Sequence, residues 1–162
     1  MLLLLVHHGD AVGPDVDTRR PLSGRGRSGA EALALMAASK GIKPSAVWHS
    51  GKLRARETAE AFWRHCNALA DFSAEPGLQP DDPPSVMHSR LSGESRDLVI
   101  VGHMPHLARL MRLLVGGDVD APLPFPPHGA VALEPSPERH ERCWIERWRL
   151  DEPRKDDGTP SR

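Results

Sequence analysis

The chain has 162 residues, and its 21 basic and 22 acidic side chains are interspersed and leave a formal net charge of −1. A domain commonly holds roughly 100–200 residues, so we expect one compact domain and no room for a second of ordinary size. The balanced charge offers no dominant basic surface, which excludes nucleic acid and anionic membrane as expected partners.

The cysteine content and the apolar N-terminus bear on the cellular compartment. Cys66 and Cys143 are the two cysteines and show no CxxC spacing, which argues against a disulfide framework and against a cysteine-based zinc site. A reducing cytoplasm is therefore the expected location. The apolar run at residues 2–6 is far shorter than the roughly 20 residues of a bilayer span and lacks a basic flank, so it predicts a buried strand.

The first half of the chain alternates strand and helix patterns. The continuous apolar run at residues 2–6 suits a central parallel strand. Residues 26–39 carry alanine and leucine at helical spacing, and residues 46–49 form a short apolar run. From Leu53 an apolar stripe continues to Ala70, which predicts a helix of about four turns that covers one sheet face.

The second half repeats this alternation after a proline-punctuated stretch. Residues 73–97 predict a loop beside the functional site, with a short helix at 86–91. The pattern then predicts a central strand at 98–101, a helix at 106–115, and late strands at 130–133 and 143–150. Trp144 and Trp148 share strand parity and are expected on one face of the sheet.

Strands that alternate with helices predict an α/β fold, a three-layer α/β/α sandwich with a mostly parallel central sheet. The predicted domain spans residues 1–150. The polar segment 151–162 is expected to be a disordered tail.

Histidines follow two of the predicted central strands, where ligands bind in open α/β sheets. His8 comes directly after the first apolar run and His103 after the run at 98–101. If those strands are neighbours, the two imidazoles face one crevice. Arg54 and Arg56 enter the long helix, whose first turn favours an anion, but they differ by two positions, so at most one of them faces that crevice.

Four motifs together give the chain its resemblance to a known family. They are His7-His8-Gly9-Asp10-Ala11, then Arg20-Pro21-Leu22-Ser23, then Ser50, Arg54, Ala55 and Thr58 in a Ser-x-x-x-Arg-Ala-x-x-Thr pattern, and finally Gly102-His103-x-Pro105. In this order and spacing they resemble the histidine phosphatase superfamily, and in particular the small phosphohistidine phosphatases of the SixA type. The resemblance covers roughly residues 2–150.

This resemblance implies a role for each matching residue. His8 would be the nucleophile that attacks phosphorus, Arg54 the phosphate clamp and His103 a second imidazole that holds the phosphoryl group, with Arg20 at the rim. A neutral imidazole attacks phosphorus only where preorganised donors offset the charge of the phosphate oxygens, which suits this set. The expected enzyme is a metal-independent hydrolase without cofactor, and its expected partner is a phosphohistidine-bearing phosphotransfer protein or another phosphorylated substrate.

The chain departs from the family pattern at His7, where relatives carry an arginine that binds phosphate. Imidazole presents no fork, and with a reference pKa near 6.5 it is only partly charged at neutral pH. A bound phosphate dianion raises that pKa, so His7 is expected to act as a cation below neutral pH. Weaker phosphate binding and a more acidic optimum than in relatives are the predicted consequences.

A second departure concerns the proton donor for the leaving group. Where relatives often carry Pro-Glu-Leu, this chain reads Pro-Gly-Leu at 76–78, and Glu75, Asp81 and Asp82 nearby give no pattern that selects one. An alcohol leaving group needs a positioned acid, whereas imidazole departs readily without one. The missing donor therefore favours a phosphohistidine substrate over a sugar phosphate.

Three other interpretations stay open at this point. One is a member that binds phosphate or a phosphoprotein without hydrolysing it, as the lost arginine suggests. Another is a broad small-molecule phosphomonoesterase, which the short chain disfavours because it leaves little sequence for a specificity cap. A metal site among the nine histidines is the third, and no ligand spacing such as HExxH supports it.

Overall fold

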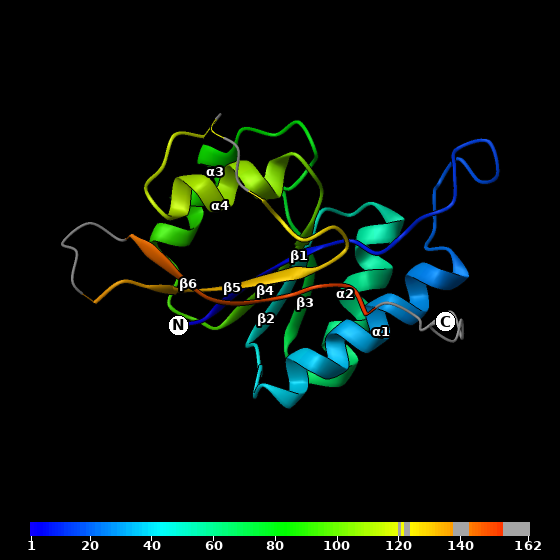
Figure 1. Ribbon diagram of the computed structural model, residues 1–162, viewed down its shortest axis with the longest axis horizontal. Coiled ribbons are helices and arrows are strands. Elements are labelled where there is room, and N and C mark those ends of the chain that lie inside the picture. The colour runs from blue at the N-terminus through cyan, green and yellow to red at the C-terminus, as the bar shows by residue number, and fades with distance from the viewer. Residues whose placement is uncertain (120, 122–123, 138–142, 154–162) are drawn as a thin grey trace, which may run out of the picture.

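A computed structural model describes residues 1–119, 121, 124–137 and 143–153, and within these ranges six strands and four helices form. The strands are β1 (Leu3–His7), β2 (Ala46–His49), β3 (Asp71–Ala74), β4 (Leu98–Gly102), β5 (Ala130–Pro135) and β6 (Trp144–Leu150). The helices are α1 (Gly24–Ser39), α2 (Leu53–Cys66), α3 (Pro84–Ser92) and α4 (His106–Leu114). Figure 1 shows the elements as one sheet with helices on both faces.

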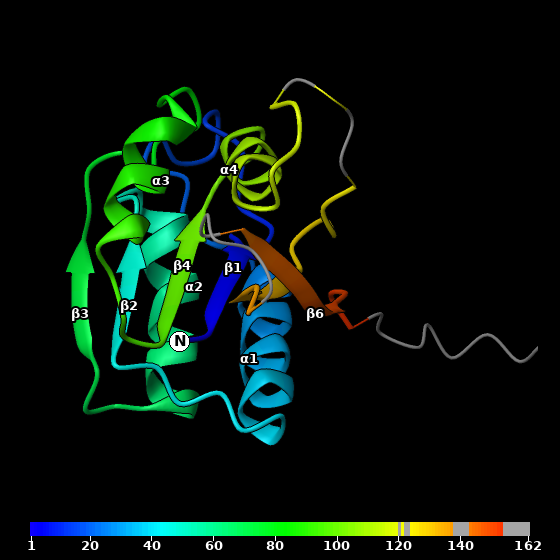
Figure 2. The ribbon, with the colours of Figure 1, turned by 90° about the vertical axis from the view of Figure 1, so that its left-hand side faces the viewer.

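The sheet has the strand order β3-β2-β4-β1-β5-β6 and is mostly parallel. Strands β1 to β4 pair in parallel and point the same way in Figure 2, whereas β5 and β6 are antiparallel to their neighbours. The predicted three-layer sandwich is confirmed. The reversed direction of β5 places its start at the edge where β1 and β4 end.

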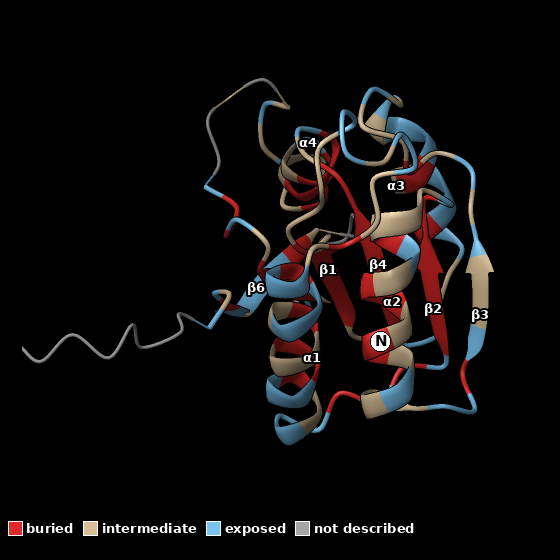
Figure 3. Ribbon diagram, turned by 90° about the vertical axis from the view of Figure 1, so that its right-hand side faces the viewer, coloured by how far each residue is buried: buried red, intermediate tan, exposed pale blue. Residues whose placement is uncertain are grey.

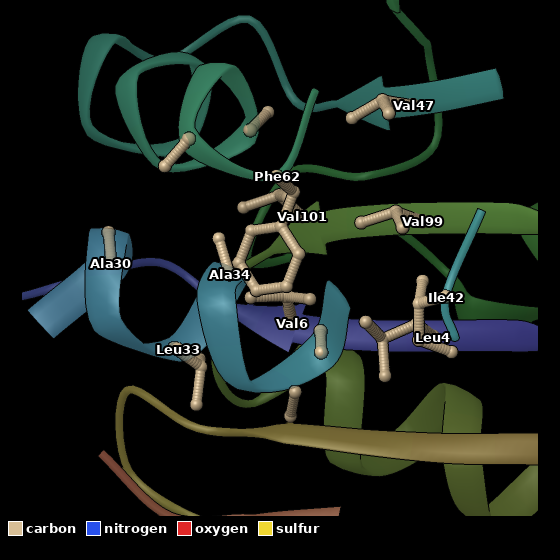
Figure 4. Packing of buried hydrophobic residues seen from close by; sticks show 14 of the residues in the cluster. Leu4, Val6, Ala30, Leu33, Ala34, Ile42, Val47, Phe62, Val99 and Val101 are labelled. Carbon is tan, nitrogen blue, oxygen red and sulfur yellow. The ribbon is translucent and has the colours of Figure 1, made fainter. Parts of the chain in front are cut away.

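The core lies on both sides of the central strands, as the continuous apolar runs predicted. Leu4 and Val6 of β1 face α1 and α2, while Leu3 and Leu5 face α3 and α4, and all four side chains are fully buried. The burial map in Figure 3 shows β1, β2 and β4 as buried strands. On the face covered by α1 and α2, the ring of Phe62 reaches from α2 toward α1 and the sheet (Figure 4).

Helix α2 ends at Cys66, one turn before the predicted end of the apolar stripe. Asn67 leaves the helix with an extended backbone (φ −166°), and its side-chain amide donates to the Pro44 carbonyl at 2.9 Å. Ala70 still belongs to the buried cluster, but it packs there from the connection to β3.

Strand β3 was not predicted, because its four residues form no apolar run. It pairs only with β2 among the described strands and lies at an edge of the sheet, where its residues stay exposed or half-buried. An edge strand is hydrogen-bonded along one edge only and is less buried than a central strand. Its sequence therefore need not form the continuous apolar run of a strand that is buried on both faces.

The prediction that Trp144 and Trp148 lie on one face is wrong. Trp144 packs in the cluster under α3 and α4, whereas Trp148 packs against the cluster under α1 and α2. The reason is a β-bulge: Ala132 pairs with Trp148 and Leu133 with Glu146, so Arg147 is an extra residue in β6. One inserted residue reverses the alternation of side chains along a strand.

The predicted tail falls mostly outside the described residues, since 154–162 are not among them. None of the described helices combines the length and the apolarity that crossing a bilayer requires.

Candidate active site

The two candidate histidines meet because β1 and β4 are neighbours. The strands pair in parallel with His7 opposite Gly102, so His8 and His103 both follow the same edge of the sheet. Their ring centroids lie 4.9 Å apart. The condition on which the expected crevice depended, adjacency of the two strands, is therefore met.

Hydrogen bonds fix which nitrogen of His8 is free. Its Nδ1–H donates to the Gly9 carbonyl at 2.8 Å, so the neutral ring carries its lone pair on Nε2. The Nε–H of Arg54 donates to that Nε2 at 3.3 Å. Burial lowers the pKa of His8 to about 4, and the Arg54 charge adds to this effect. At neutral pH, His8 thus offers an unprotonated nitrogen next to a guanidinium.

The loop after β1 is tied to the first turns of α1 and α2. The Gly9 amide donates to the Thr58 hydroxyl at 3.0 Å, and that hydroxyl donates to the Arg54 carbonyl at 2.8 Å. A side chain at position 9 would put its Cβ 2.8 Å from the Gly26 carbonyl oxygen, so only glycine allows this approach. Thr58 of the sequence motif therefore couples the backbone beside His8 to that of Arg54.

Of the arginines near the start of α2, one faces the histidines and one does not. Arg54 contacts His8, whereas Arg56 is exposed and pairs with Glu60 at 3.0 Å. Arg20 has a left-handed backbone (φ 51°), and its Nε–H donates to the Val12 carbonyl at 3.2 Å. Its charge still lowers the pKa of both His8 and Arg54, which puts Arg20 in the electrostatic neighbourhood of the site.

His103 is held through one ring nitrogen and leaves the other unpaired. Its Nε2 lies 2.6 Å from the Ser50 hydroxyl, and burial together with the neighbouring His8 lowers its pKa to about 3. The Nδ1 atom is buried without a hydrogen-bond partner among the described residues. When the Ser50 hydroxyl donates to Nε2, Nδ1 carries the proton and is a buried donor without a partner. Leaving such an atom unpaired costs about 1–3 kcal/mol.

His7 is held against His128 by a hydrogen bond and by ring stacking. Its Nδ1 accepts the backbone N–H of His128 at 2.9 Å, and its ring stacks on the His128 ring at 4.8 Å between centroids. Burial, followed by the neighbouring His8 and His128, lowers the pKa of His7 to about 3. The phosphate-free site therefore holds a neutral His7 throughout the physiological range. The predicted acidic optimum concerns the site with a bound phosphate dianion, which would raise this pKa, and it stays a prediction.

Glu75, one of the acidic residues near the Pro-Gly-Leu segment, binds side chains of its own surroundings. Although burial acts to raise its pKa, hydrogen bonds from Ser73 and Arg90 lower it, and the Arg90 contact measures 2.7 Å. The Asp82 carboxylate accepts the backbone N–H of Gln79 at 2.8 Å, and the side-chain amide of Gln79 donates to the Ser50 carbonyl at 2.6 Å. The loop between β3 and α3 thus reaches the site, and it does so with an amide.

Three imidazoles come close enough to be considered as metal ligands. Potential ligand atoms of His7, His8 and His128 lie within 4.8 Å of one another. The Nδ1–H groups of His8 and His128 donate to backbone carbonyls, which leaves a lone pair on each Nε2. The Nδ1 of His7 already accepts a proton donor, so its Nε2 is protonated and cannot bind a cation. The set offers two ligands, and Arg54 adds a positive charge beside them.

His128 is the residue at this site whose place the sequence reasoning missed. It precedes β5, and the start of a strand is not where ligands bind in a parallel sheet. Because β5 runs antiparallel to β1, its start lies at the edge where β1 ends, and His128 reaches the main chain of His8. The signal that would have found it is the direction of β5, which short apolar runs do not reveal.

Two neutral imidazoles beside a guanidinium, at the carboxyl edge of a mostly parallel sheet, form an arrangement suited to an anionic ligand such as a phosphoryl group. Residues 3–79 match the family model of the histidine phosphatase superfamily (branch 1). The matched segment is thus similar to this superfamily, and it spans somewhat less than half of the chain. No curated protein matches the chain in sequence.

Solved structures of the superfamily share the fold. The protein histidine phosphatase SixA complexed with tungstate superposes with a TM-score of 0.80 at 20% identity, covering 93% of this chain and 97% of that one. The putative SixA of Agrobacterium tumefaciens gives 0.74 at 22% identity, with coverage of 92% and 96%. A putative alpha-ribazole-5'-P phosphatase of Escherichia coli K-12 gives 0.72 at 17% identity, with coverage of 93% and 96%. At these identities the likeness establishes the fold.

Proposed function

We propose that this protein is a phosphohistidine phosphatase in which His8 becomes transiently phosphorylated. The observation that carries the proposal is the tautomer of His8. The Gly9 carbonyl holds Nδ1–H at 2.8 Å, so the lone pair on Nε2 is available for attack, and a pKa of about 4 keeps it available at neutral pH.

Arg54 and His103 supply the donors that a phosphoryl group requires. The guanidinium of Arg54 can leave the Nε2 of His8 and bind two phosphoryl oxygens, a fork that a lysine lacks. His103 offers its unpaired Nδ1 as a neutral donor. Once Arg54 has moved onto the bound phosphoryl group, both donors stabilise the transition state because they need no further rearrangement when charge builds up.

The reaction has two steps. First, Nε2 of His8 attacks phosphorus and the bond from phosphorus to the substrate nitrogen breaks. Its electron pair stays on the departing imidazole, whose other nitrogen takes a proton from water. Water then attacks phosphorus, the bond to Nε2 breaks, and orthophosphate leaves while His8 recovers its lone pair. The proton that water loses goes to the solvent or to the phosphate.

Among the described residues, the carboxylate of Glu75 is already bound, and this favours phosphohistidine as substrate. Glu75 is bound to Arg90 and Ser73, and the neighbouring loop brings the amide of Gln79 to Ser50. An amide cannot protonate an alkoxide, but an imidazole leaving group does not need that help. We expect the partner to be a phosphohistidine-bearing phosphotransfer protein, and the reaction to need neither metal nor cofactor.

A small-molecule phosphomonoesterase is the second candidate, supported by the shared fold of the alpha-ribazole-5'-P phosphatase. One experiment separates the possibilities. The protein is incubated with a phosphorylated histidine phosphotransfer domain, with p-nitrophenyl phosphate and with sugar phosphates, and acid-labile phosphate on His8 is sought by rapid quench and mass spectrometry.

We expect turnover of the phosphohistidine substrate at least tenfold above that of the sugar phosphates, with label on His8. Hydrolysis that persists in His8→Ala contradicts the mechanism. Preferred hydrolysis of sugar phosphates contradicts the substrate class. Binding of the phosphorylated domain without hydrolysis identifies a protein that only binds phosphate.

A further inference from the structure

His128 contacts both motif histidines, although the proposed reaction assigns it no part. Its ring Nδ1–H donates to the His8 carbonyl at 2.6 Å, and its backbone N–H donates to Nδ1 of His7 at 2.9 Å. Its ring also stacks on His7 with an interplanar angle of 15°. One residue is thus bound to the main chain of the nucleophile and to the side chain of its neighbour.

These bonds determine what His7 can present to a ligand. A neutral imidazole has one protonated and one unprotonated nitrogen, and the atom facing a backbone N–H must be the unprotonated one. His7 therefore carries its proton on Nε2. In the other tautomer, Nε2 would turn a lone pair toward phosphate oxygens, which repel it.

The main chain around His128 is held in place from both sides. The His7 amide donates to the Gly129 carbonyl at 2.9 Å, and the Gly129 amide donates to the Pro126 carbonyl at 2.9 Å. His128 itself has a left-handed backbone, with φ 51°. Of the ordinary residues, glycine and asparagine accept this conformation most readily.

We propose that His128 is a positioning residue: it holds His7 as a neutral Nε2–H donor, and this pair replaces the arginine of related sites as a phosphate ligand. The assignment rests on the proposed function, because it takes the ligand to be a phosphoryl group. The side chain of His128 anchors the His8 carbonyl, which keeps its own backbone N–H opposite Nδ1 of His7. The pair contributes a hydrogen bond without a charge.

Three substitutions separate the roles of ring and backbone. His128→Asn retains a side-chain N–H close to the position of Nδ1 and tolerates the left-handed backbone. His128→Gly tolerates the backbone but has no donor. His128→Ala lacks the donor and also strains the backbone, so a loss seen in Ala but not in Gly reports backbone strain alone.

Orthophosphate and tungstate affinities measured by calorimetry provide the first readout, since they do not depend on turnover. A lost neutral hydrogen bond is worth about 0.5–1.5 kcal/mol, which corresponds to an affinity about 2- to 12-fold lower. We expect this loss in His128→Gly, and affinity within about twofold of wild type in His128→Asn. Because the bond acts on bound substrate and transition state alike, KM rises while kcat changes little.

Long-range proton–nitrogen NMR of the phosphate-free protein gives the second readout. We expect His7 to show protonated Nε2 and unprotonated Nδ1 at pH 7, and to show a mixture of tautomers in His128→Gly. In a His7→Arg background, His128→Gly should no longer weaken orthophosphate binding, since arginine donates from every nitrogen.

The proposal is overturned if His7 carries its proton on Nδ1, or if His128→Gly binds orthophosphate as wild type does. The role of His128 stands if His128→Gly weakens orthophosphate binding and His128→Asn binds it as wild type does. If in that case the wild-type protein hydrolyses no phosphohistidine, the proposed function fails on its own. Turnover through His8 with unchanged affinities in all three variants supports the function and rejects the role of His128.

Discussion

The Nε–H of Arg54 lies 3.3 Å from Nε2 of His8, the one ring nitrogen that the Gly9 carbonyl leaves unprotonated. In the proposed reaction, this guanidinium lies where the phosphoryl oxygens would approach His8. The contact joins the end of β1 to the first turn of α2, and Thr58 holds the two backbones together.

Replacing Arg54 tests its role as the clamp. Removal of one preorganised donor costs about 10²- to 10³-fold in rate, so we expect Arg54→Ala to lower kcat/KM by that amount. The kcat/KM of Arg54→Lys should lie between the values for wild type and Arg54→Ala, because lysine retains the charge and loses the fork. The matched control is Arg56→Ala, whose side chain is exposed and paired with Glu60, and it should stay within about twofold. If Arg54→Ala and Arg56→Ala lowered kcat/KM equally, Arg54 would not be the phosphate clamp.

The protonation of the histidines predicts how stability depends on pH. Burial lowers the pKa values of His7, His8 and His103 to about 3, 4 and 3, whereas in the unfolded chain these groups titrate near 6.5. Below pH 6.5 the unfolded chain binds protons that the folded protein excludes. The free energy of unfolding is therefore highest above pH 6.5 and decreases as the pH falls toward 4.

Urea unfolding between pH 7.5 and 5.5 measures this slope. Each excluded proton contributes at most about 1.4 kcal/mol per pH unit. His49 and His106, whose pKa values are also lowered by burial, add to the total. Comparison with His103→Asn isolates one site, because the variant should show a shallower slope whatever its absolute stability. An unchanged slope would mean that His103 titrates alike in both states.

Sequence patterns predicted the central strands and the helices because burial on both faces selects their residues. Leu3–His7 and Leu98–Gly102 are buried almost throughout, and an apolar run is the direct trace of that environment. The edge strand Asp71–Ala74 and the bulge at Arg147 leave no such trace. The first is exposed, and the second depends on the register with β5, which local sequence does not encode.

Motif spacing brought His8, Arg54 and His103 to one place in the prediction, and the structure does place them together. The state of His7 was out of reach, because its low pKa arises from burial and from neighbours distant in sequence. His128, which sets its hydrogen bonding, lies more than a hundred residues away and precedes an antiparallel strand. Contacts of this kind follow from topology, and no local pattern carries them.

Gly26 lies where α1 meets the loop after β1, and its replacement should damage both stability and the site. A Cβ at this position would lie 1.9 Å from the Asp10 carbonyl oxygen, which also accepts the Ser23 amide at 3.0 Å. We expect Gly26→Ala to cost about 1–3 kcal/mol or more in urea unfolding, since backbone must move. Gly24→Ala is the matched control, because its Cβ meets nothing within 4 Å in the same helix turn. If both variants were at least as stable as wild type, the loop after β1 would move aside without cost, and the prediction would be wrong.

His7→Arg tests the electrostatic consequence of the motif's departure. The wild-type site holds a neutral His7, so the substitution adds a charged donor in place of a neutral one. Hydrogen bonds to charged groups contribute about 1.5–3 kcal/mol against about 0.5–1.5 for neutral ones, which predicts roughly tenfold tighter orthophosphate binding. The pH dependence of kcat/KM near neutrality should remain the same, since a His7 with a pKa of about 3 does not titrate there. A shift of the pH optimum toward neutrality would contradict this prediction. It would mean that bound phosphate protonates His7 to the imidazolium in the wild-type protein. The neutral pair of His7 and His128 would then not persist in the complex.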